Sequence, residues 1–198
     1  MSKDETRYSS LPLYPRFIAA LFFGGIVSLP PAQPNGSLNH WSKRGLLIVI
    51  DEARRQLDAQ SATLDRVLSR AQILLTTLLA VVAIFASATP AVWSYHANPG
   101  VALVAKIFLC CAGASLLLGL LGAAAVISVT KRYEAINAAV LSKWDAFDLR
   151  RLAREYAECV GAGEQTGNAH ITVLGNAVRF TVYGSILFAA AWAVVLSL

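Results

Sequence analysis

Long apolar runs alternate with polar stretches along this chain. Residues 71–93 and 107–130 contain no charged side chain, and each run is long enough to cross the roughly 30 Å hydrocarbon core of a bilayer as a helix. The Asn-Pro-Gly sequence at 98–100 is typical of a turn, because proline fixes φ and glycine adopts conformations that other residues avoid. The pattern predicts a transmembrane helical hairpin over residues 71–130.

Two further apolar stretches lie near the ends of the chain. Residues 177–198 carry a single charged side chain, Arg179, which can snorkel to the membrane interface, so we expect a third transmembrane helix there. Residues 17–29 are apolar but too short to span. For the N-terminal segment, residues 1–45, we therefore expect an interfacial or re-entrant helix. One alternative is that this segment forms a fourth span. Another is that the sequence begins at a start codon upstream of the natural one, so that its first residues are not native.

A cytoplasmic helix that runs directly into the first span is predicted for residues 46–70, which contain neither glycine nor proline. Side chains recur there every seven residues in two interleaved sets, so one narrow stripe faces a partner helix. The two sets are Ile50, Leu57, Leu64 and Ala71, and Ala53, Gln60 and Val67. The partner is either another helix of the same chain or a second copy in a homotypic coiled coil. On the solvated face, Asp51 with Arg55 and Arg54 with Asp58 are expected to pair.

A second helical segment outside the membrane is predicted for residues 131–176. The apolar side of its first part consists of Tyr133, Ile136, Val140 and Trp144. Ser142 and Asp145 have the spacing of a capping box, which predicts a new helix that ends near Cys159. The glycine-rich residues 161–168 then predict a flexible connector before the third span.

Small residues recur every four positions in the second span, at Ser115, Gly119 and Ala123. Small side chains let helix backbones approach closely in lipid, where van der Waals contact drives association. We expect this stripe to close the hairpin against the first span. Contact between copies in a homo-oligomer is the alternative.

The composition indicates an all-α integral membrane protein. Of the 198 residues, 56% are hydrophobic and 15% are charged, and the mean hydropathy is +0.55. The net charge of +5 does not indicate a nucleic-acid partner, because the cations flank the predicted spans. Basic residues stay on the cytoplasmic side. We therefore expect residues 46–70 and 131–176 in the cytoplasm of a multi-pass inner-membrane protein, with the C-terminus outside.

Recognisable catalytic and metal-binding motifs are missing from the sequence. The three histidines are scattered, and there is no zinc-protease, phosphate-binding-loop, nucleophile-elbow or paired-cysteine motif. Three cysteines do not make a disulfide framework, and we interpret them as small packing residues: Cys110, Cys111 and Cys159. We therefore predict no enzyme activity, no cofactor and no metal site, and the lipid bilayer is the expected partner.

The candidate binding residues are cations that have aromatic residues close to them in sequence. Arg150 and Arg154 lie four apart on one predicted helix face, with Arg151 beside them and Trp144 and Tyr156 nearby. Guanidinium groups bind phosphate and aromatic rings stack on bases, so this set is a candidate nucleotide site. Alternatively, Arg151 and Arg154 pair with the glutamates four residues further on.

The order of a cytoplasmic helix, a tight two-span hairpin, a helical segment and a final span resembles that of the small transmembrane effectors of the Pycsar anti-phage system. It resembles the SLATT family more loosely. The local match is at residues 68–75, which are similar to the family's Asp-x-Lys-Ala followed by an apolar span. Here Arg70 takes the lysine's place, Ala71 matches, and the acidic residue is missing. The resemblance covers residues 46–198.

This resemblance implies a membrane effector that senses a cyclic mononucleotide made in the cytoplasm during phage infection and then impairs membrane integrity. The second hypothesis comes from another class of protein. It is a structural membrane adaptor that holds a cytoplasmic partner through its helices.

Overall fold

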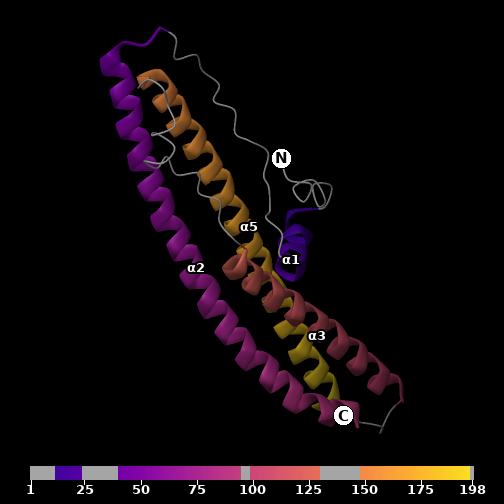
Figure 1. The fold of residues 1–198 in the computed structure, drawn as a ribbon. Coiled ribbons are helices and arrows are strands. Elements are labelled where there is room, and N and C mark those ends of the chain that lie inside the picture. The colour runs from indigo at the N-terminus through magenta and orange to yellow at the C-terminus, as the bar shows by residue number, and fades with distance from the viewer. Residues whose placement is uncertain (1–11, 24–39, 95–98, 130–147, 197–198) are drawn as a thin grey trace.

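The computed structural model describes residues 12–23, 40–94, 99–129 and 148–196, and all regular secondary structure within them is helical. This confirms the predicted all-helical fold for the described part of the chain. Figure 1 shows its helices: α1 (Leu13–Phe23), α2 (Lys43–Trp93), α3 (Pro99–Ser128) and α5 (Leu149–Leu196).

Helices α2 and α5 lie side by side along most of the length of the molecule and run in the same direction (Figure 1). Helix α3 returns antiparallel to both and covers only their C-terminal halves. The molecule therefore has a three-helix bundle at one end and a two-helix extension at the other. We call this extension the arm and define it as residues 43–66 of α2 with 149–168 of α5.

Three helices, α2, α3 and α5, are long and apolar enough to cross a membrane. They contain the first predicted span and all but the last two residues of the other two. Helix α2 alone has 51 residues, about 76 Å at a rise of 1.5 Å per residue, which is more than twice the thickness of a hydrocarbon core. One helix thus includes both the predicted cytoplasmic helix and the first span.

Helix α2 begins after a capped first turn. Ser42 is the N-cap, and its side chain accepts a hydrogen bond from the backbone N–H of Gly45 at 3.2 Å, which satisfies one of the free donors at the helix start. The seven-residue stripe then continues beyond Ala71, because Leu78 and Val92 are also fully buried. The predicted periodicity therefore extends through the whole helix.

The partner of this stripe is helix α5 of the same chain. Leu46 and Ile50 form a buried cluster with Leu152 and Ala153 at the tip of the arm. At the far end of the molecule the rings of Phe85 and Phe188 pack with their centroids 5.3 Å apart. Of the two predicted partners, the structure contains the helix of the same chain. A coiled coil between two copies stays a prediction.

Helix α5 runs unbroken through residues 161–168, so the predicted flexible connector is wrong. Glycines in a helix interior usually cost stability, but α2 packs directly against this part of α5, and Gly163 is buried under Gln60. The helix begins at Leu149, just after Asp148, whose carboxylate accepts a hydrogen bond from the backbone N–H of Arg150 at 2.9 Å. The predicted capping box and the apolar side of residues 133–144 lie outside the described residues.

Gly119, the central residue of the small-residue stripe in α3, packs against α5. The prediction that the stripe packs on the first span is therefore wrong at this residue. A Cβ atom at Gly119 would lie 2.8 Å from Oγ1 of Thr181 and 3.1 Å from the carbonyl oxygen of Ala177. Gly184 makes the reciprocal approach, since a Cβ there would lie 2.8 Å from Cγ of Leu116. Close backbone packing therefore joins the second and third predicted spans.

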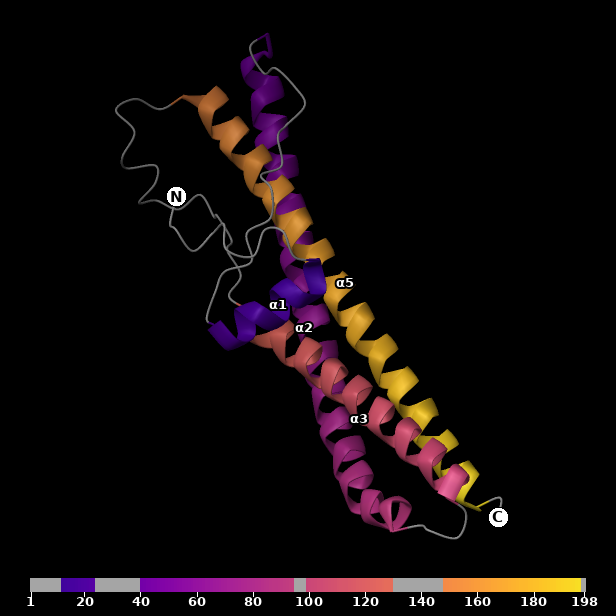
Figure 2. The same cartoon turned by 90° about the vertical axis from the view of Figure 1, so that its right-hand side faces the viewer.

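The short helix α1 lies across α3 and α5 where the arm meets the bundle (Figure 2). Phe17 is 1% exposed and packs with Ala71, Val126 and Val173, which come from the three long helices. The described helix has 11 residues, fewer than a membrane span needs, and the interfacial or re-entrant location stays a prediction. The rest of the predicted apolar stretch, residues 24–29, lies outside the described residues.

Candidate functional site

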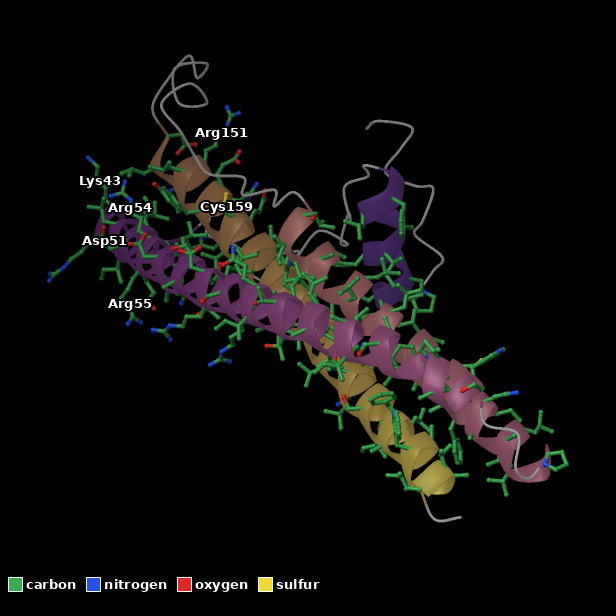
Figure 3. The ribbon with its side chains drawn as sticks, turned by 90° about the horizontal axis from the view of Figure 1, so that it is seen from below. Lys43, Asp51, Arg54, Arg55, Arg151 and Cys159 are labelled. Atoms are coloured by element: carbon green, nitrogen blue, oxygen red, sulfur yellow. The ribbon has the colours of Figure 1, made fainter. Side chains whose placement is uncertain are left out.

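The three candidate arginines lie in the first two turns of α5, and all are exposed. They are Arg150, Arg151 and Arg154. Leu152 and Ala153, between them in sequence, are buried against α2. Figure 3 shows Arg151 and Arg55 on opposite outer sides of the helix pair. The arm tip is therefore apolar between its helices and carries charged side chains of both signs outside.

The side chain of Tyr156 contacts α2, unlike the arginine side chains, which face outward. Arg54 Nε of α2 donates a hydrogen bond to Tyr156 Oη at 3.1 Å, and its guanidinium carbon lies 5.3 Å from the centre of the ring. This hydrogen bond raises the pKa of Arg54 above its usual range. The ring also packs on the cluster at the arm tip. Tyr156 is thus committed to the contact between α2 and α5, and Trp144 lies outside the described residues.

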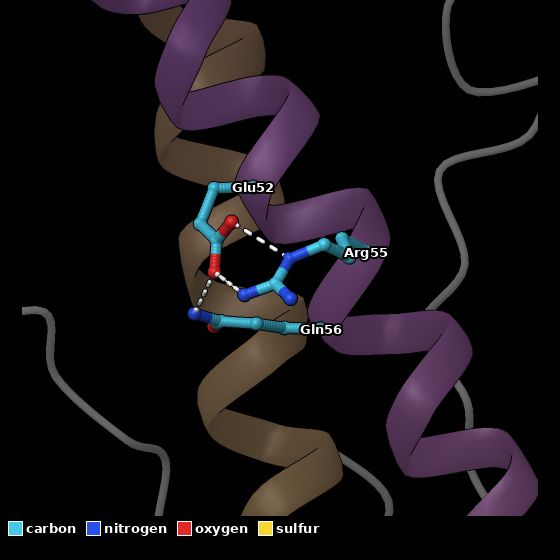
Figure 4. A network of polar contacts seen from close by, with 3 residues as sticks. All are labelled: Glu52, Arg55 and Gln56. Atoms are coloured by element: carbon cyan, nitrogen blue, oxygen red, sulfur yellow. Dashed lines mark hydrogen bonds and ion pairs between the residues drawn. The ribbon is translucent and has the colours of Figure 1, made fainter.

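The predicted charge pairs have different partners in the structure. Arg55 bonds to Glu52 through two nitrogens, at 2.9 Å from Nε and 2.7 Å from Nη2, and Gln56 donates to the same carboxylate at 3.1 Å (Figure 4). The predicted Asp51–Arg55 pair is therefore wrong, and Arg54 bonds to Tyr156 in place of Asp58.

The pKa of Glu52 is held below its usual range first by the hydrogen bond from Arg55 and then by that from Gln56. This network is local to one turn of an exposed helix face, where such pairs add little stability. In the part of α5 that the structure describes, no ion pair joins Arg154 to Glu158. The guanidinium of Arg154 thus faces solvent without that carboxylate.

A groove of about 450 Å³ lies between the two helices of the arm. Its polar lining residues are Gln56, Gln60, Thr63, Glu164 and Asn168. Among the described residues the lining offers amides, a hydroxyl and one carboxylate but no cation, so this lining suits a neutral or cationic polar ligand better than a phosphate. None of the candidate arginines lines it.

Gln60 occupies the inner wall of this groove. Its Nε2 donates to the carbonyl oxygen of Val160 at 3.1 Å, while its Oε1 is buried and accepts no hydrogen bond from the residues that the structure describes. A Cβ atom at Gly163 would overlap that Oε1. Sequence periodicity placed Gln60 in the contact stripe correctly, but it gave no sign of the groove, which forms between residues of two helices that are about a hundred positions apart in sequence.

Arg70 and Ala71, the residues of the local family resemblance, lie where the arm joins the bundle. Ala71 is fully buried in the cluster that also contains Phe17 of α1, and Arg70 is exposed beside it. The two residues therefore have different roles. Ala71 permits close helix packing, and Arg70 lies directly before the first residue of the apolar span.

The described residues contain no group of three or more histidine, cysteine, aspartate or glutamate side chains that could hold a metal ion. Together, fold and site define an all-helical protein with three helices able to cross a membrane and a charged helical arm. No protein-family model, curated protein or solved structure matches this chain.

Proposed function

We propose that this chain is a membrane-embedded effector in which a signal bound at the cytoplasmic arm changes the packing of the membrane-spanning helices. The observation that carries this proposal is the continuity of α2 and α5, which have 51 and 48 residues and extend from the arm tip through the bundle. Packed helices move as rigid elements, so a shift at one end of such a pair is carried to the other.

The signal in this proposal is a cyclic mononucleotide, and the output is impaired membrane integrity in anti-phage defence, as the resemblance to Pycsar effectors implies. The exposed guanidinium groups of Arg150, Arg151 and Arg154 are suited to bind its phosphate. Tyr156 enters the proposal in a modified role. Because it is bonded to Arg54 of α2, it links the arginine-bearing turn to the other helix of the arm.

A structural adaptor is the second candidate function, and a specific observation favours it. The arginines lie on the outer surface of a helix, and they line neither the groove in the arm nor the hollow between α1, α3 and α5. Outward-facing arginines of this kind suit hydrogen bonds to acidic side chains of a protein partner.

The effector proposal predicts that changing Arg150→Gln and Arg154→Gln together weakens the response. Charge-assisted hydrogen bonds contribute roughly 1.5–3 kcal/mol each, so each arginine lost should raise the required signal about tenfold or more. The measurement is depolarisation of cells that express the protein, with each of a panel of cyclic mononucleotides produced inside the cell.

The matched control is Arg44→Gln with Arg66→Gln, which removes two exposed arginines from α2 of the same arm. Membrane insertion is checked for every variant by extraction with alkaline carbonate. If the inserted Arg150/Arg154 variant responds at the wild-type signal level, these arginines are not the site. If no nucleotide of the panel depolarises wild-type cells, the effector proposal fails and the adaptor is favoured.

A further inference from the structure

A second and larger hollow, of about 800 Å³, lies between α1, α3 and α5. Four aromatic side chains line it, together with aliphatic ones, and its polar lining includes an amide and a guanidinium. The aromatic residues are Tyr14, Phe22, Phe180 and Tyr183, and the polar side chains are Asn176 and Arg179. Pockets for lipid- or drug-sized ligands have this range of volume and this mixture of many apolar groups with few polar ones.

The wall that α1 contributes is held in place by specific contacts. Tyr14 Oη donates a hydrogen bond of 2.6 Å to the carbonyl oxygen of Leu118, and its ring packs on Phe180 with 5.3 Å between centroids. Gly122 makes room for this hydroxyl, since a Cβ there would overlap it. Burial raises the pKa of Tyr14 to about 12. The hydroxyl therefore stays protonated at neutral pH, as a donor must.

Arg179 places the α5 side of this groove near the expected membrane interface, whereas Leu118 on its α3 side lies at the middle of the predicted second span. Arg179 lies two residues into the predicted third span, and in that position an arginine is expected to reach the headgroup region. The rings of Phe22 and Tyr183 are 65% and 58% exposed, as aromatic side chains at an interface commonly are. Among the residues that the structure describes, no carboxylate lines the groove, so the positive charge of Arg179 has no acidic partner among them.

We propose that this groove binds an anionic phospholipid of the cytoplasmic leaflet, with the phosphate at Arg179 and Asn176 and an acyl chain along Phe22, Phe180 and Tyr183. A guanidinium binds phosphate oxygens through paired hydrogen bonds, and cationic pockets between membrane helices on the cytoplasmic side are typical headgroup sites. Such a lipid contacts α1 and α5 together and stabilises α1 where it crosses the bundle. The inference rests on the membrane location within the proposed function and is independent of the nucleotide signal.

The experiment measures lipid binding to the full chain in nanodiscs that contain phosphatidylglycerol and phosphatidylcholine in equal amounts. Native mass spectrometry then counts the lipids retained after release. Wild-type protein should retain phosphatidylglycerol preferentially, and Arg179→Gln should reduce this preference about tenfold. Arg66→Gln removes an exposed arginine elsewhere in the chain and should leave the preference unchanged.

A second variant, Ala19→Trp, fills the groove without changing its charge, because Ala19 belongs to the lining. It should reduce retention of phosphatidylglycerol while Arg179 is intact. Equal retention of both lipids by wild-type protein overturns the proposal, as does an equal effect of Arg179→Gln and Arg66→Gln. Competition by soluble glycerol phosphate would show a site for free phosphate and would also overturn it. Failure of carbonate-resistant insertion would instead refute the membrane location that the proposed function requires.

Discussion

At the scale of single residues, the contact between Gln60 and Gly163 determines how closely the arm helices pack. Gln60 is bonded to the backbone of α5 through Nε2, and its Oε1 occupies the space that a side chain at position 163 would need. One turn further on, Gly167 has open space around its missing Cβ. The same residue type thus has two different roles within four positions.

This difference predicts opposite effects of one substitution. Gly167→Ala should stabilise the helix by about 0.5–1 kcal/mol, because alanine has the higher helix propensity and nothing obstructs its methyl group. Gly163→Ala gains the same propensity but displaces Gln60 from a partly buried hydrogen bond, a loss of about 1–3 kcal/mol. Thermal unfolding in detergent, followed by circular dichroism, measures both. A Gly163→Ala protein as stable as Gly167→Ala would show that Gln60 moves without cost.

At the scale of elements, the sequence predicted the stripe of α2 well, because apolar spacing of seven residues reports directly on which side of a helix is buried. Ile50, Leu64 and Ala71 are all buried as expected. The stripe could not identify its partner, since the same spacing serves a neighbouring helix or a second copy. Nor could local composition show that residues 161–168 stay helical, because tertiary packing on α2 outweighs the low helix propensity of glycine there.

The buried stripe gives a prediction for the arm as a unit. Leu64 is 1% exposed, whereas Ile48 of the same helix is 61% exposed. Leu64→Asp should destabilise the arm by several kcal/mol, because an unpaired charge enters an apolar contact. Ile48→Asp should change stability by no more than about 0.5 kcal/mol. The measurement is the rate of trypsin cleavage at the arm arginines.

Leu64→Asp should be cleaved faster than wild type, and Ile48→Asp at the wild-type rate. Equal rates for the two variants would contradict the packing of α2 on α5. Crosslinking in detergent on the same samples addresses the predicted homo-oligomer. If wild-type dimers form and persist in Leu64→Asp, the contact between copies uses a face other than this stripe.

At the scale of the whole molecule, sequence reasoning identified three helices able to cross a membrane and placed a charged helical region beside them. It did not predict that the candidate site residues lie in different places on the arm. The arginines face outward, Tyr156 is bonded across to α2, and a polar groove lies further along the arm. These positions depend on the rotation of α5 about its axis, which follows from contacts between residues about a hundred positions apart and has no local signal.

The last prediction concerns orientation, on which the proposed cytoplasmic signal depends. Cations gather near the arm, and basic segments stay in the cytoplasm. A cysteine at Asn98, between α2 and α3 in sequence, should therefore react with an impermeant thiol reagent in intact cells. Ser61→Cys, on the exposed side of the arm, should react only after lysis. Both are made in a chain whose three cysteines are changed to alanine. Labelling of Ser61→Cys in intact cells would put the arm outside, where no nucleotide made in the cytoplasm could reach it.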